Sequence, residues 1–198
     1  MDVKICGMTH REDVQHAALA GADYVGLIFS QSSKRQVSLA KAQELCQVAK
    51  NYGIEPVGVF VTEGFEEIFY IAKTLELKTI QLHGSTPKES LHILMNSFSI
   101  IYACKADEII PSFPSITLLF DQEKEEHSLP LDLHGIHLPL GRHFWLAGGL
   151  TVDNVQEKIR QVQPHGVDVA RGVETFGSLR KDPVLMSLFI QKVKQEEL

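Results

Sequence analysis

Hydrophobic residues in this chain gather in short runs that alternate with longer stretches of helical periodicity. Runs such as "YVGLIF" and "ITLLF" are apolar at nearly every position, which is typical of parallel strands covered on both faces. Between them, stretches such as "SLAKAQELCQVAKNYG" place their apolar residues on one helical face. The pattern predicts strands at residues 3–6, 24–28, 56–61, 79–82, 100–103, 116–120, 144–147 and 167–170.

Helix boundaries are indicated by capping residues. Thr9 and Glu12 in "THRE" fit a capping box, in which both side chains satisfy free N–H groups of the first turn. Asp182, which precedes a proline, fits a polar N-cap. Gly53 fits the left-handed residue that ends a helix, and Cys46 falls on the apolar face of that helix. We therefore expect Cys46 in the core.

Eight strands separated by helices are the count of an α/β fold, the (β/α)8 or TIM barrel. The 198 residues are close to the minimum of about 200 for this fold, so we expect reduced helices after strands five and six. An open doubly wound sheet is the alternative, but it more often has fewer strands and a GxGxxG turn, which the sequence lacks. No linker divides the chain, and residues 1–198 are expected to form a single barrel domain.

Charge and composition narrow the range of partners. The formal net charge is -6 and no basic cluster occurs, which argues against nucleic acid or an anionic membrane as a partner. No signal segment or membrane-length apolar stretch is visible, so a cytoplasmic protein is expected. Cys6, Cys46 and Cys104 are odd in number and widely spaced, which favours free thiols over disulfides or a metal site. We expect no metal and no cofactor, and either a monomer or a homodimer.

In a barrel the carboxyl ends of all strands meet at one face, so the residues at these ends are candidates for catalysis. Cys6 ends the first strand, where it is either an inert buried thiol or a general base. Asp121 ends "ITLLFD", where it either caps a turn or acts as a general acid. An acid and a base from opposite parts of the ring could flank one small substrate.

Candidate anion-binding residues follow other strands. Arg35 is either a solvated loop residue or a planar fork for a carboxylate. Gly148, Gly149 and Gly172 follow strands seven and eight, where such barrels often bind phosphate through backbone N–H groups. His83 in "IQLHG" fits a neutral hydrogen-bonded group at the site better than a proton carrier. The expected partner is therefore a small phosphorylated molecule.

Several motifs together resemble one family. "KICGMT", "GADYVGLIF", "SKRQV", "GVFV", "IQLHG", "LLFD", "LAGGLTVDNV" and "DVARGVE" run in order over nearly the whole chain and resemble phosphoribosylanthranilate isomerase, a barrel enzyme of tryptophan biosynthesis. The resemblance implies an Amadori rearrangement of N-(5-phosphoribosyl)anthranilate. It also implies that Cys6 is the general base, that Asp121 is the general acid and that Arg35 holds the anthranilate carboxylate.

Two stretches depart from the family pattern. After the strand-six aspartate the chain reads "QEKEEHSLPLDLHGIH" where the family usually carries a Gly-Gly-Thr-Gly loop. At strand eight the usual "SSG" is replaced, and Arg171 either adds a phosphate contact or points outward. Two alternative functions stay open at this point: a non-catalytic phosphosugar-binding barrel, and an isomerase or epimerase of a related phosphosugar.

Overall fold

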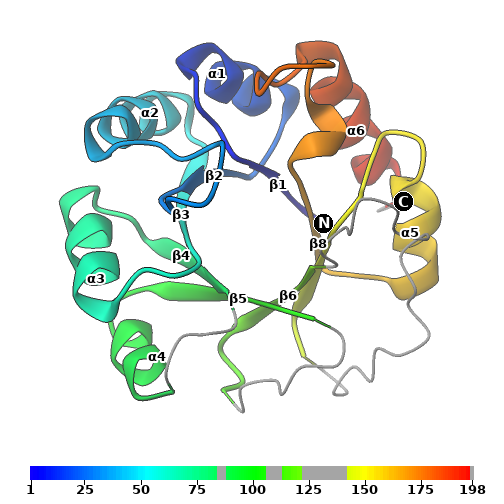
Figure 1. Ribbon diagram of the computed structural model, residues 1–198. Helices are drawn as coiled ribbons and strands as arrows, with labels where there is room; N and C mark the ends of the chain where they lie inside the picture. The colour runs from blue at the N-terminus through cyan, green and yellow to red at the C-terminus, as the bar shows by residue number, and fades with distance from the viewer. Residues whose placement is uncertain (84–87, 106–112, 122–141, 197–198) are drawn as a thin grey trace.

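The computed structural model describes residues 1–83, 88–105, 113–121 and 142–196. Eight parallel strands close into a barrel in chain order, with β8 paired to β1 (Figure 1). The predicted (β/α)8 barrel is confirmed, and every strand end lies within one residue of its expected position. The strands are β1 (Asp2–Cys6), β2 (Tyr24–Ile28), β3 (Glu55–Phe60), β4 (Thr79–His83), β5 (Ser99–Cys104), β6 (Thr117–Asp121), β7 (Phe144–Ala147) and β8 (Gly166–Val169).

Helices surround the barrel on the outside (Figure 1). They are α1 (Arg11–Ala20), α2 (Leu39–Tyr52), α3 (Phe65–Thr74), α4 (Lys88–Met95), α5 (Val155–Val162), the short 3-10 helix η1 (Arg171–Val173) and α6 (Pro183–Gln195). The reduced helices expected after β5 and β6 fall on 106–112 and 122–141, outside the described residues. Within the described ranges, no helix combines the length and the apolar character needed to cross a membrane.

The predicted helix boundaries had mixed outcomes. The Asp182 carboxylate caps α6 by accepting from the backbone N–H groups of Val184 and Leu185, at 2.8 and 3.1 Å. Gly53 ends α2 with a φ of 72°, as expected. The capping box at Thr9 was wrong, because α1 begins after His10 and the Thr9 hydroxyl instead contacts the His10 ring, at 2.8 Å.

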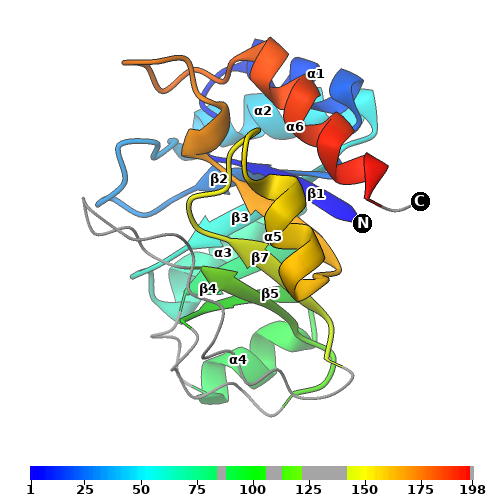
Figure 2. The same cartoon turned by 90° about the vertical axis from the view of Figure 1, so that its right-hand side faces the viewer.

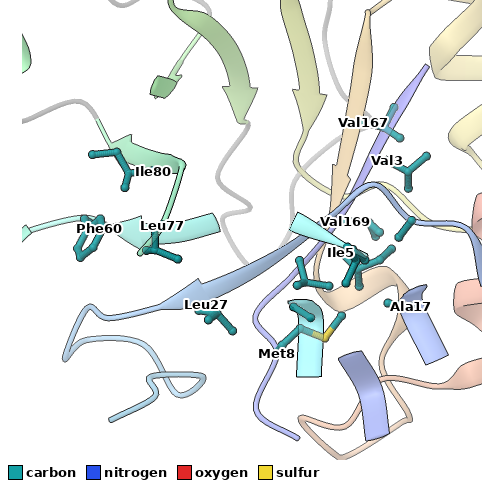
Figure 3. Close-up of a cluster of buried hydrophobic side chains, with 14 of the residues drawn as sticks. Val3, Ile5, Met8, Ala17, Leu27, Phe60, Leu77, Ile80, Val167 and Val169 are labelled. Carbon is teal, nitrogen blue, oxygen red and sulfur yellow. The ribbon is translucent and has the colours of Figure 1, made fainter. Parts of the chain in front are cut away.

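Side chains of each strand alternate between the barrel interior and the layer under the helices. Val3 and Ile5 of β1 point outward and lie beside Val167 and Val169 of β8 (Figure 3). The intervening residues of β1 therefore point into the barrel. Its interior contains a separate apolar cluster formed by Val57, Ile101, Ala103, Leu119, Trp145 and Ala147. This cluster fills part of the barrel interior with apolar side chains.

Candidate active site

The carboxyl ends of the strands place all the candidate residues at one end of the barrel. Figure 2 shows the loop after β2 and the segment after β8 projecting from this end, with both chain termini at the other. The last residues of β1, β4 and β6 are Cys6, His83 and Asp121. The segments after β2, β7 and β8 carry the other candidates, which are Arg35, Gly148, Gly149, Arg171 and Gly172.

Cys6 faces the barrel interior and is buried. A Cβ on the neighbouring Gly26 of β2 would lie 2.6 Å from the Cys6 Sγ, so only glycine leaves room for this thiol. Burial raises the pKa of Cys6, and the positive charges of Lys4 and Lys181 oppose that rise. The thiol is thus buried next to two cations and one carboxylate, and burial has the larger effect on its pKa.

A buried lysine next to Cys6 was not foreseen from the sequence. The Lys4 ammonium is fully buried and donates to Gln81 Oε1 at 2.8 Å and to Asp168 Oδ1 at 3.1 Å. Burial favours the neutral amine, but the charges of Asp168 and Cys6 outweigh it and raise the pKa of Lys4. A lysine at an inward position of an apolar strand, two residues before the cysteine, was the available signal.

Glu174, which follows η1, is a second residue that sequence reasoning missed. Its carboxylate accepts from Arg35 Nε at 2.5 Å and from Arg35 Nη2 at 2.7 Å, and also from Lys181 Nζ at 2.9 Å. Burial opposes its ionisation, but the Arg35 hydrogen bonds and the Lys181 charge outweigh burial and lower the pKa of Glu174. Arg35 is therefore a fixed fork rather than a solvated loop residue, and its remaining N–H groups suit a further acceptor.

Asp121 and His83 complete the set at the ends of β6 and β4. Asp121 is half-buried and follows the inward-facing Leu119 by two residues, so it lies on the inner face of its strand. In the closed barrel β7 and β8 separate β6, which carries Asp121, from β1, which carries Cys6. His83 Nε2 lies 3.2 Å from the Gln81 amide nitrogen, which joins it to the group around Lys4. The topology thus supplies a carboxyl group and a thiol to one rim.

The turns after β7 and β8 lie against each other. Gly148 and Gly149 both have positive φ, 87° and 68°, and the Asn154 side chain binds the Gly149 carbonyl at 3.0 Å. A Cβ on Gly172 would lie only 1.9 Å from the Leu150 carbonyl oxygen, so the two turns touch through backbone alone. Arg171 is exposed beside this contact. Two adjacent glycine turns of this kind suit a phosphate group.

Gly172→Ala should therefore disturb this junction. We expect a loss of about 1–3 kcal/mol in the free energy of unfolding, because the new methyl group displaces the Leu150 backbone. Urea unfolding curves measure it. The matched control is Gly64→Ala, where a Cβ meets nothing within 4 Å. Superimposable unfolding curves for wild type and Gly172→Ala would contradict the contact.

Metal ligands are not grouped in the described part of the chain: no cluster of three or more His, Cys, Asp or Glu side chains could hold an ion there. The polar groups named above are cations, an amide, an imidazole, several carboxyl groups and one thiol. The pKa directions of Lys4, Cys6 and Glu174 follow from burial and from their charged neighbours. This arrangement suits proton transfer on an anionic substrate.

Sequence comparison links the whole chain to one family. A family model described as N-(5'phosphoribosyl)anthranilate (PRA) isomerase matches residues 3–192. The N-(5'-phosphoribosyl)anthranilate isomerase of Chlamydia felis is 43% identical over 202 residues, which cover 98% of this chain and 97% of the relative. The similarity is therefore not confined to the glycine turns or to the opening motif.

Structural comparison agrees. The phosphoribosyl anthranilate isomerase of Thermotoga maritima has a TM-score of 0.86 at 31% identity, covering 98% of this chain and 99% of that one. A structure of such an isomerase in complex with reduced 1-(o-carboxyphenylamino)-1-deoxyribulose 5-phosphate has a TM-score of 0.82 at 30% identity, with the same coverage. With this barrel, this rim and these relatives, the chain belongs to the N-(5'-phosphoribosyl)anthranilate isomerase family.

Proposed function

We propose that this chain catalyses the Amadori rearrangement of N-(5-phosphoribosyl)anthranilate to 1-(2-carboxyphenylamino)-1-deoxyribulose 5-phosphate, a step of tryptophan biosynthesis, with Asp121 as general acid and Cys6 as general base. The observation that carries the proposal is the pair of inward-facing groups at the ends of β6 and β1. The solved relative that holds a reduced product analogue supports the choice of substrate.

The reaction needs one proton delivered and one removed. Asp121 protonates the ring oxygen of the sugar, and the ring opens to a Schiff base between the first sugar carbon and the anthranilate nitrogen. The Cys6 thiolate then removes the proton from the second sugar carbon. The electron pair of that C–H bond moves toward the iminium nitrogen and gives an enolamine, which tautomerises to the ketone. The cationic iminium makes the C–H acidic, so a thiolate is a sufficient base.

Binding of the two ends of the substrate is assigned to separate groups. The N–H groups of Arg35 not used by Glu174 hold the anthranilate carboxylate. The turns at Gly148, Gly149 and Gly172 hold the phosphate, with the exposed Arg171 beside them. His83 contributes a neutral hydrogen bond to the sugar, since its ring is already in contact with Gln81. The reacting carbons are thereby held between β6 and β1.

A turnover assay on the purified chain tests the proposal. Freshly generated phosphoribosylanthranilate should lose its anthranilate fluorescence in the presence of catalytic amounts of protein, and the product should be identified by its ketone, because an isomerisation leaves the mass unchanged. Fluorescence changes that saturate at one equivalent, without product, would indicate a non-catalytic binding barrel instead.

Arg35→Met should raise KM about 10–100-fold with a smaller change in kcat, because charge-assisted hydrogen bonds to the substrate carboxylate are lost. Initial rates over a range of substrate concentrations separate the two constants. Lys78→Met, which removes an exposed cation at the other end of the barrel, is the control and should leave KM unchanged.

The same variant discriminates between substrates. If Arg35→Met kept the wild-type KM, the carboxylate would not be recognised at this residue. A related phosphosugar without a carboxylate would then be the better substrate.

A further inference from the structure

The ammonium of Lys4 is an unusual group to find inside the barrel. It lies two residues before Cys6 on the same strand, so both side chains point into the interior. Its side chain is 0% exposed, and it is held by Gln81 of β4 at 2.8 Å and Asp168 of β8 at 3.1 Å. A buried ion pair often stabilises a fold no more than apolar side chains of the same volume would. We therefore expect this lysine to have a role that an apolar side chain could not fill.

The hydrogen bonds of Lys4 fix its ammonium beside the thiol. An ammonium has three N–H groups. Two of them go to Gln81 and Asp168. Cys6 shares the inward face of β1 with Lys4, and the positive charge of Lys4 lowers the pKa of the thiol against the larger effect of burial. The ammonium is therefore placed where it favours the charged form of Cys6.

We propose that Lys4 is a positioning residue that holds Cys6 ready as a thiolate, and that Gln81 and Asp168 fix the Lys4 ammonium in the direction of the sulfur. The proposal rests on the proposed function, in which the Cys6 thiolate removes the substrate proton. Lys4 keeps its own proton throughout and acts on the substrate only through Cys6.

Other charged groups face Cys6 and must be compared with Lys4. Lys181 and Arg35 also carry positive charge near the sulfur, but both are bound to Glu174. Asp168 is the negative group that opposes a thiolate at this position. Lys4 is thus the fully buried cation that shares the inward face of β1 with Cys6, and Asp168 weakens its effect while keeping it protonated.

Two substitutions at Lys4 should affect the Cys6 titration differently. In Lys4→Met the inflection should rise by about one pH unit or more, because the positive charge beside the thiolate is lost. In Lys4→Arg the inflection should stay near the wild-type value, because the positive charge is kept. A general loosening of the barrel would move both variants the same way.

The titration is measured without substrate. Thiolate absorbance near 240 nm is followed against pH in a Cys46→Ala, Cys104→Ala background, which leaves Cys6 as the sole thiol. The rate of Cys6 alkylation by iodoacetamide at each pH, from digested peptides, is the second readout. The pH profile of kcat/KM should shift in the same direction as the titration.

A raised inflection in Lys4→Met, with an inflection near wild type in Lys4→Arg, supports the proposal. A folded Lys4→Met protein whose Cys6 titrates like wild type overturns it. If Lys4→Met does not fold, Gln81→Met decides, because Gln81 is uncharged and binds the Lys4 ammonium: a raised inflection supports the proposal, and an unchanged or lowered one overturns it. Because no substrate is used, a failed turnover assay would refute the proposed function without altering this result.

Discussion

Cys6→Ala is expected to lower kcat by about 10²–10⁴-fold while KM changes little, because the general base is lost and the groups that hold the substrate stay in place. The substitution removes only the sulfur of Cys6. The neighbouring Gly26 has no side chain that could fill the space left behind. Steady-state rates measured by loss of anthranilate fluorescence give both constants.

The control is a second buried thiol. Cys46 lies in the apolar core on α2, away from the rim, so Cys46→Ala should cost some stability and leave kcat near wild type. If Cys6→Ala, folded by circular dichroism, turned substrate over at a near-normal rate, Cys6 would not be the base.

The wild-type pH profile follows from the same thiol. Burial raises the pKa of Cys6, and only the thiolate can take the proton. The thiolate fraction therefore grows as pH increases, so kcat/KM should rise from neutral into mildly alkaline solution. The rising limb should be absent from the residual activity of Cys6→Ala.

The strands could be predicted almost to the residue because their signal is local. A β-strand buried on both faces must be apolar at nearly every position, whether or not its partners are known. β7 is such a strand, and it was predicted with the bounds that the structure gives. The last residues of the strands could likewise be placed at one rim, because all strands of a closed parallel barrel run in the same direction.

The ion pairs of the rim could not be predicted, because they join residues that are distant in the sequence. Arg35 and Glu174 are 139 residues apart, and Lys4 and Asp168 are 164 apart. Their contact depends on the exact register between β1 and β8 and on the path of the segment after β8. A sequence pattern has no period that reports such a contact.

The capping box at Thr9 shows the opposite failure, in which a local pattern was present but another local contact replaced it. The motif places Thr9 three residues before Glu12. In the structure the Thr9 hydroxyl contacts the His10 ring, and α1 begins one residue later than the motif requires. Glu12 lies 3.8 Å from the Arg180 guanidinium instead.

Asp121→Asn is expected to lower kcat about 10²–10⁴-fold, because the amide keeps the shape of the carboxyl group but cannot give a proton to the ring oxygen. Asp23→Asn is the matched control: Asp23 is also half-buried, but it lies at the other end of the barrel, where it binds Lys194 at 3.1 Å. Asp23→Asn should lose some stability and retain turnover.

The two catalytic variants should differ in which step limits the rate. With Asp121→Asn the ring opens slowly, and a deuterium at the second sugar carbon should have almost no effect on kcat. With Cys6→Ala the removal of the hydrogen from the second sugar carbon is slow. The substrate with deuterium at that carbon should therefore react distinctly more slowly than the unlabelled substrate. Equal isotope effects in the two variants would contradict the division of labour between acid and base, even if both variants were impaired. The comparison therefore tests the order of the steps as well as the identity of the residues.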